Sequence, residues 1–161
     1  MKIDSILAPD RVFARVDASS KKRAIEFAAL KIVEALPDLV VGDVYRGLID
    51  REKMGSTGLG DSVAIPHCRV SSCDRIVASL FVFEDGIDFS SPDEQPVKIM
   101  FVLLVPESET SEHLATLSML AERLQCERYR EALIKAEDDA SLYSRAIEHI
   151  EDLRAQSSCS P

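Results

Sequence analysis

The chain has 161 residues, of which 46% are hydrophobic and 29% are charged, and its formal net charge is -9. This length and composition favour one domain with a single core. No run of lysine and arginine stands out, so the sequence lacks the basic patch typical of proteins that bind nucleic acid or anionic membranes. No apolar run approaches the roughly 20 residues that span a bilayer, and the first residues do not resemble a secretion signal. We therefore expect a cytoplasmic protein without membrane insertion, whose four cysteines are reduced thiols.

Five segments carry apolar residues at helical spacing. The first begins after Ser19 or Ser20, which can cap it, and ends before Pro37. The others are predicted at Asp43 to about Arg51, from about Ser111 through Leu124, at Arg128 to about Ala136, and at Ala140 to about Leu153.

Strand patterns lie between these helices, at Val12 to Val16, Val63 to Ile65, Arg75 to Phe83 and Val97 to Val105. The last of these is almost wholly apolar, as a central strand covered on both faces would be. Helices before, between and after strands predict an α/β fold, a single-domain sandwich whose central mixed β-sheet is flanked by helices on both faces.

Three glycines within six residues predict a turn-rich loop from Gly55 to Gly60, after the second expected helix. Such a loop can offer backbone N–H groups to an anion. It does not match the Walker phosphate loop, since no Lys-Ser/Thr follows the glycines. The dinucleotide fingerprint also fails, since the spacing differs and no strand precedes the loop. Taken alone, the loop is more typical of a plain connection.

A short apolar strand and the pair Pro66-His67 follow the loop. Proline fixes its own φ and biases the preceding residue toward extended geometry, so we expect His67 just past a strand end, where open α/β sheets bind ligands. A neutral imidazole is a good nucleophile toward phosphorus. Arg69 should point to the same side of an extended chain, where its guanidinium can neutralise phosphoryl oxygens. These residues alone leave a structural or merely exposed histidine as open as a nucleophile.

The segment from Gly55 to Arg69 resembles the signature of the fructose/mannitol class of enzyme IIA proteins of the bacterial phosphoenolpyruvate-dependent phosphotransferase system. The likeness extends over nearly the whole chain and includes Arg51-Glu52 before the loop and Glu112-His113-Leu114 in the third expected helix. Within this class the chain most resembles the nitrogen-regulatory enzymes IIA, which stand alone as one small domain. Residues 1–154 would form that domain and residues 155–161 a disordered tail. The matching signature residues are Ser56, Thr57, Gly58, Val63, Ala64, Ile65, Pro66, His67 and Arg69.

The resemblance implies a phosphorelay in which His67 accepts a phosphoryl group from the active histidine of a small phosphocarrier protein of the HPr/NPr type. It also implies that His113 hydrogen-bonds the phosphoryl group at His67 as the second active-site histidine. No cofactor and no metal is required. The expected phosphoryl-binding residues are Arg51, Arg69, Ser56 and Thr57.

Two positions depart from the family pattern. Ser62 stands where glycine is common, and we expect its small side chain to be tolerated. Cys68 stands where glycine or alanine is common, and it could crowd carrier docking, make the site oxidisable or simply be accommodated.

Several other functions remain open at this point. A nitrogen-regulatory protein would act on targets such as sensor kinases or potassium-transport proteins through its phosphorylation state. A sugar-transport enzyme IIA would instead pass the phosphoryl group to the IIB domain of a separate membrane permease. The residue types also allow a Cys68–His113 nucleophilic pair or a zinc site. The zinc ligands would be His67, Cys68, Cys73 and His113, although the two cysteines are spaced more widely than a usual zinc hook.

Overall fold

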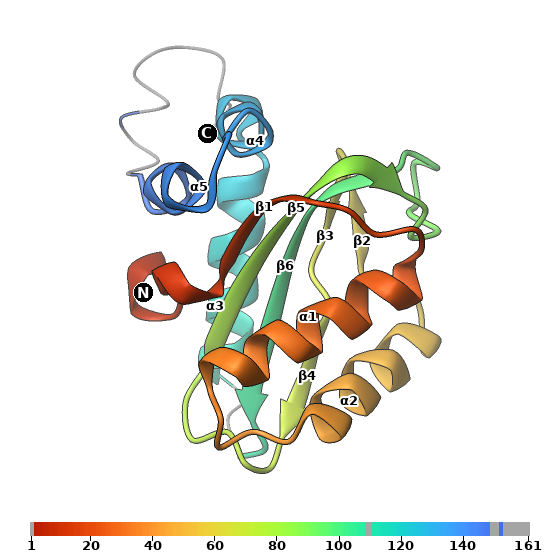
Figure 1. Cartoon of the computed structure of the whole chain (residues 1–161), viewed down its shortest axis with the longest axis vertical. Coiled ribbons are helices and arrows are strands. Elements are labelled where there is room, and N and C mark those ends of the chain that lie inside the picture. The colour runs from red at the N-terminus through yellow and green to blue at the C-terminus, as the bar shows by residue number, and fades with distance from the viewer. Residues whose placement is uncertain (1, 109–110, 149–151, 153–161) are drawn as a thin grey trace.

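The computed structural model describes residues 2–108, 111–148 and 152. Its six-stranded sheet has the order β1-β5-β6-β3-β2, with β4 beside β6 as well (Figure 1). The pairs β1/β5, β3/β6 and β4/β6 are parallel, and β5/β6 and β2/β3 are antiparallel, so the sheet is mixed as expected. The strands are β1 (Val12–Val16), β2 (Gly58–Gly60), β3 (Val63–Ala64), β4 (His67–Val70), β5 (Val77–Ile87) and β6 (Val97–Pro106).

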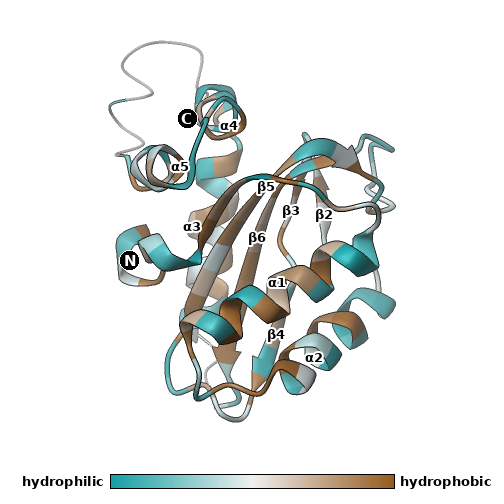
Figure 2. Cartoon of the chain, in the orientation of Figure 1, coloured by the Kyte–Doolittle hydropathy of each residue, from teal (hydrophilic) through white to brown (hydrophobic). Residues whose placement is uncertain are grey.

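Helices cover both faces of this sheet, which confirms the predicted fold class. One face carries α1 (Lys21–Ala35) and α2 (Val41–Lys53). The opposite face carries two short 3-10 helices, η1 (Ile3–Ser5) and η2 (Pro9–Arg11), together with α3 (Ser111–Leu124), α4 (Glu127–Ile134) and α5 (Asp139–Ala146). The strands β5 and β6 are hydrophobic along most of their length, because they lie between the two layers (Figure 2).

The helix ends follow the sequence signals. The Ser20 side chain accepts a hydrogen bond from the backbone N–H of Arg23, which caps α1, and the helix ends before Pro37. Helix α2 extends two residues beyond the predicted segment at each end, from Val41 to Lys53. Helix α5 is shorter than predicted and ends at Ala146. The remainder of that prediction falls partly on residues 149–151 and 153, which lie outside the described residues, as does the predicted tail.

The hairpin formed by β2 and β3 was not predicted. Its two central residues, Asp61 and Ser62, have φ of 55° and 64°, as a tight two-residue hairpin turn requires. Glycine is favoured in this left-handed region because it has no Cβ. A glycine at position 62, as in the signature that the segment resembles, would adopt this conformation without strain, whereas the serine is held here in an unfavourable conformation.

No helix in the described part of the chain is long and apolar enough to cross a membrane. Of the cysteines, Cys68 and Cys73 are free and buried.

Candidate functional site

His67 begins strand β4 at a break in the line of strands beside β6. Val63 and Ala64 of β3 pair with Ile99 and Met100, and after two residues His67 pairs with Leu103 in the same register. Hydrogen bonding to β6 continues across the break, because the Pro66 carbonyl accepts a hydrogen bond of 2.9 Å from the N–H of Leu103. His67 therefore lies just past the end of β3, as predicted, and it also begins β4, which continues the pairing of β3 along β6.

The imidazole of His67 is held in one tautomer. Its Nδ1 lies 2.8 Å from the carbonyl oxygen of Ile65. A carbonyl can only accept, so Nδ1 carries the proton and Nε2 carries the lone pair. Burial lowers the pKa of His67, and Arg51 lowers it further, whereas the bond to Ile65 and the charge of Glu52 oppose this shift. The geometry and the lowered pKa together give a neutral ring with a nucleophilic Nε2.

His113 lies in the first turn of α3 and faces His67 across the site. The two ring centroids are 5.5 Å apart and the rings are inclined by 64°. Burial lowers the pKa of His113, and the nearby His67 and Arg69 lower it further. Its Nε2 atom is buried and has no hydrogen-bond partner among the described residues. A buried polar nitrogen of this kind is ready to bond an incoming group, and its place at a helix N-terminus favours an anion.

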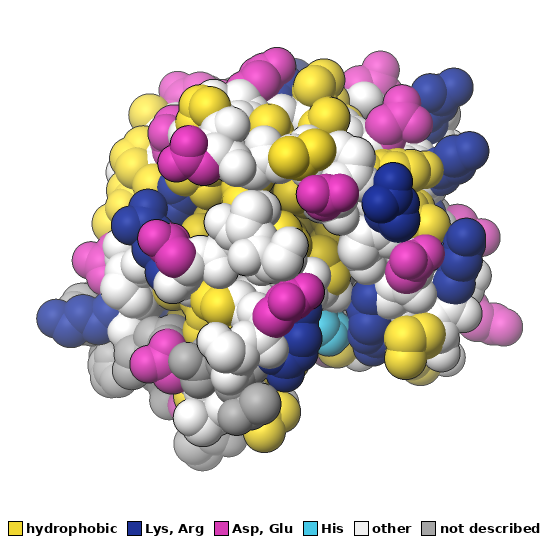
Figure 3. Space-filling view, turned by 90° about the horizontal axis from the view of Figure 1, so that it is seen from below, with side chains coloured by type: hydrophobic (Ala, Val, Ile, Leu, Met, Phe, Trp, Pro, Cys, Tyr) yellow, Lys and Arg dark blue, Asp and Glu magenta, His cyan; other side chains and the backbone are white. Residues whose placement is uncertain are grey.

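Two arginines lie near the histidines. Arg69 donates hydrogen bonds to the carbonyl oxygens of Pro106 and Glu107, at 3.4 and 3.0 Å, and its charge acts on His113. Arg51, in the last turn of α2, donates to the carbonyl of Gly55 at 2.9 Å, and its charge acts on His67. A space-filling view shows a histidine at the surface with basic side chains on either side (Figure 3). The site therefore combines a neutral nucleophile with positive charge that can attract a phosphoryl group.

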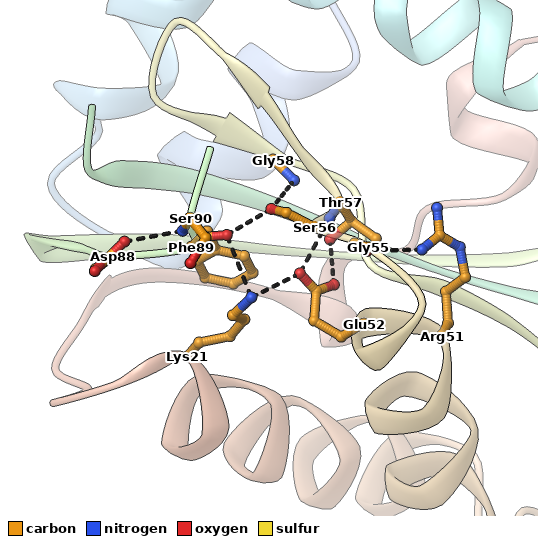
Figure 4. Close-up of polar contacts among 10 residues, drawn as sticks. All are labelled: Lys21, Arg51, Glu52, Gly55, Ser56, Thr57, Gly58, Asp88, Phe89 and Ser90. Carbon is orange, nitrogen blue, oxygen red and sulfur yellow. Dashed lines mark hydrogen bonds and ion pairs between the residues drawn. The ribbon is translucent and has the colours of Figure 1, made fainter. Parts of the chain in front are cut away.

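The glycine loop was expected to offer hydrogen-bond donors to an anion, but Ser56 and Thr57 use their donors within the protein. The Thr57 hydroxyl donates to Glu52 at 2.6 Å, and the Thr57 backbone N–H donates to the same carboxylate at 3.0 Å. Ser56 donates its hydroxyl hydrogen to the carbonyl of Phe89 and accepts from the N–H of Gly58 (Figure 4). These groups are occupied within the protein, so they hold the loop and do not offer free donors to a ligand.

Two residues of this arrangement were not identified from the sequence. Glu52 entered only as part of the resemblance, and nothing in the local sequence of Lys21 marked it. Their connection becomes visible only in the fold, where Lys21 lies 3.0 Å from the Glu52 carboxylate. A glutamate directly before a glycine loop and next to a candidate site arginine is the signal that could have identified Glu52.

Cys68 and Cys73 lie on the other face of the sheet. Cys68 follows His67 in β4 and is buried with Cys73 in the core under α1 and α2, where Gly47 of α2 leaves room for its sulfur. Burial raises the pKa of Cys68 to about 12. The thiol therefore neither crowds the His67 side nor pairs with His113, and the four ligands of the zinc alternative cannot converge on one ion. In the described residues, no group of three His, Cys, Asp or Glu side chains is arranged to hold a metal.

Comparison with known proteins places this geometry in a family. Residues 5–149 match the family model described as "Phosphoenolpyruvate-dependent sugar phosphotransferase system, EIIA 2". The chain is 36% identical over 148 residues to a nitrogen regulatory protein of Pseudomonas aeruginosa, covering 92% of this chain and 96% of that protein. It is 38% identical over 146 residues to the Escherichia coli nitrogen regulatory protein, covering 89% and 88% respectively.

Solved structures agree with this assignment. The nitrogen regulatory protein IIA-Ntr of Neisseria meningitidis superposes with a TM-score of 0.79 at 38% identity, over 90% of this chain and 97% of that chain. The Escherichia coli mannitol enzyme IIA shares the fold, with a TM-score of 0.72 at 22% identity over 86% of this chain and 97% of the other. The chain thus belongs to the EIIA 2 family of the phosphoenolpyruvate-dependent sugar phosphotransferase system, and it is of the nitrogen-regulatory type.

Proposed function

We propose that this protein is a cytoplasmic phosphohistidine relay. His67 Nε2 accepts a phosphoryl group from the active histidine of an HPr/NPr-type carrier, and the phosphorylated state regulates target proteins. The observation that carries the proposal is the 2.8 Å contact between His67 Nδ1 and the carbonyl oxygen of Ile65, which directs the lone pair of the ring to Nε2. The likeness to nitrogen regulatory proteins supports regulation as the output.

The transfer is an exchange between two ring nitrogens. The lone pair of His67 Nε2 forms a bond to phosphorus while the bond between phosphorus and the carrier nitrogen breaks, and that electron pair returns to the carrier ring. The Nδ1 proton stays in place and keeps donating to Ile65. Phosphorylation thus leaves a positive ring that bears a dianionic phosphoryl group, and the Ile65 carbonyl stabilises that charge.

The surrounding residues would stabilise the moving group. His113 Nε2, buried without a described partner, would carry the proton of the neutral ring and donate it to a phosphoryl oxygen. Arg51 and Arg69 would neutralise charge on the other oxygens. Ser56 and Thr57 would not contact the phosphoryl group. Their hydroxyl groups donate to the protein, so these residues would fix the conformation of the loop.

The test is reconstitution with phosphoenolpyruvate, the first enzyme of the phosphotransferase system and a carrier protein. We expect one acid-labile, base-stable phosphoryl group per chain, and its loss in His67→Ala. Label that persists in His67→Ala would overturn the assignment of the nucleophile. Adding an isolated IIB domain tests the sugar-transport alternative, since rapid onward transfer to IIB would replace regulation as the output.

A further inference from the structure

We propose that Glu52 is a positioning residue for His67, acting through a hydrogen-bond chain that runs from Lys21 through Glu52, Thr57 and Ile65 to the imidazole. The proposal rests on the phosphorelay function proposed above and adds to it the device that orients the nucleophile. It assigns to the glycine loop the role of connecting the ion pair of Lys21 and Glu52 to the reacting ring.

The series of hydrogen bonds is centred on the buried carboxylate of Glu52. Glu52 is 8% exposed, at the end of α2. Its Oε1 accepts from Lys21 Nζ and from the N–H of Thr57, both at 3.0 Å, and its Oε2 accepts from the Thr57 hydroxyl at 2.6 Å (Figure 4). A buried charge with a partner at each oxygen has little freedom to move, and its stabilisation depends on all three donors.

Two further hydrogen bonds, one between backbone groups and one from the imidazole, connect Thr57 to His67. The carbonyl of Thr57 accepts from the N–H of Ile65 at 3.1 Å, and the carbonyl of Ile65 accepts from His67 Nδ1 at 2.8 Å. Ile65 is 3% exposed, and the proline after it restricts its backbone. The place of the Ile65 carbonyl, and with it the orientation of the imidazole, therefore depends on where Glu52 holds Thr57.

Lys21 connects this series of hydrogen bonds to the loop between β5 and β6. Besides Glu52, its ammonium donates to the carbonyl of Phe89 at 3.2 Å and lies 5.4 Å from the centre of the Phe89 ring. The hydroxyl of Ser56 donates to the same carbonyl. The start of α1, the end of α2, the glycine loop and the connection between β5 and β6 thus meet at one ion pair. Such convergence holds a loop far more firmly than a surface salt bridge does.

The functional consequence is control of the tautomer. A free neutral imidazole of histidine favours the form with the proton on Nε2, which would remove the lone pair needed for attack. The carbonyl of Ile65 selects the opposite form by accepting from Nδ1. Loosening Thr57 would weaken this selection, so a smaller share of His67 would be ready to accept a phosphoryl group. A change in Glu52 should therefore lower kcat and leave the KM for the carrier nearly unchanged.

The experiment reads the tautomer directly. Protein labelled with ¹⁵N-histidine, at about pH 8 where the rings are neutral, is examined by long-range proton–nitrogen NMR for wild type, Glu52→Gln and Glu52→Ala. The wild type should show His67 in the Nδ1–H form. The Nε2–H form should appear in Glu52→Gln and increase in Glu52→Ala, and kcat for transfer from the carrier should fall by roughly tenfold or more in Glu52→Ala.

A matched control is Glu34→Gln, which breaks an exposed pair with Lys31 on α1 at 3.3 Å and should change neither readout. If Glu52→Ala does not fold, Glu52→Gln and the near-isosteric Thr57→Val decide the question. A wild-type tautomer and wild-type kcat in both would overturn the proposal, and so would a change that only raises KM. Because the tautomer is read without carrier, a wild type that is never phosphorylated would refute the proposed function alone.

Discussion

The two faces of strand β4 place neighbouring residues in opposite environments. His67 points to the α3 side, half-buried, with its pKa lowered and its ring opposite His113. Cys68 points into the core under α1 and α2, 8% exposed, with its pKa raised to about 12. Both shifts have burial as their largest cause, yet one side chain is made more nucleophilic at neutral pH and the other is made inert. Burial disfavours the charged form of both groups. The neutral form of the imidazole is the nucleophile, whereas the neutral form of the thiol is unreactive.

The largest expected effect is the difference in phosphoryl transfer between variants of His67 and variants of Cys68. His67→Ala should abolish transfer from the carrier, whereas Cys68→Ala should retain it within about threefold, because the thiol contributes only packing. Initial rates of phosphorylation, measured on variants with matched melting curves, check this. A Cys68→Ala protein that folds normally but transfers no phosphoryl group would break the comparison between the faces.

Thiol chemistry provides the next largest contrast. Because burial raises the pKa of Cys68 to about 12, little of this thiol is ionised at neutral pH. Alkylation of Cys68 by iodoacetamide, measured by mass spectrometry of its peptide, should therefore be far slower in the native protein than in urea, where the thiol is exposed. Comparable native and unfolded rates would show that this face of the strand is open.

His113→Ala should slow phosphoryl transfer by about a hundredfold without moving the label from His67, since it removes one donor to the transferring group. Quench-flow measurement of a single turnover gives this rate. His113→Gln is the informative companion, because its amide can still donate and should recover part of the rate. Full activity in both variants would reduce His113 to a structural role.

The pH dependence tests the environment of His67 itself. Protonation of Nε2 blocks attack, so the rate follows the neutral fraction of the ring. Because burial lowers the pKa of His67 below its ordinary value of 6.5, the rate should be flat at neutral pH and fall several-fold only on the acid side of that value. Phosphoramidate, a small phosphoryl donor, avoids titrating the carrier. A midpoint above 6.5 would contradict the assigned cause.

The smallest effect concerns the hairpin that carries β3 to its place. Ser62→Gly should raise the free energy of unfolding by about 1 kcal/mol, because glycine adopts the left-handed φ of 64° without a Cβ clash. Urea denaturation measures this. Ser72→Gly, in a turn without positive φ, is the matched control and should not stabilise the protein. Equal effects in both would mean that the turn conformation at position 62 is not strained.

The long periodic segments were predictable from the sequence, and the short elements were not. Apolar spacing located α1 and α3 and the buried strand β6, because each buries a face large enough to leave a pattern. The strands β2 and β4 are three and four residues long, and neither leaves such a pattern. The break at Ile65 and Pro66 is a property of pairing with β6, so the local sequence could suggest an extended chain but not its register.

In the site, too, some features were predictable from the sequence and others depend on contacts that only the fold creates. The pairing of His67 with His113 was expected from the resemblance, and the structure brings the rings together. The contacts of Glu52 were not expected, because its partners Lys21 and Thr57 lie on other segments of the chain. The inward bonds of Ser56 and Thr57 were missed for the same reason, since a hydroxyl in a glycine loop is equally typical of a ligand donor and of a loop support.

The shared register of β3 and β4 along β6 makes the site intolerant of changes in chain length. Val63 pairs with Ile99 and His67 with Leu103, so the spacing is the same before and after the break. Deleting or inserting one residue at the break would turn the following segment over, because side chains alternate between faces. The imidazole would then enter the core and the thiol would face His113. We therefore expect the protein to tolerate changes of the side chains around His67 more readily than changes in the number of residues that lead to it.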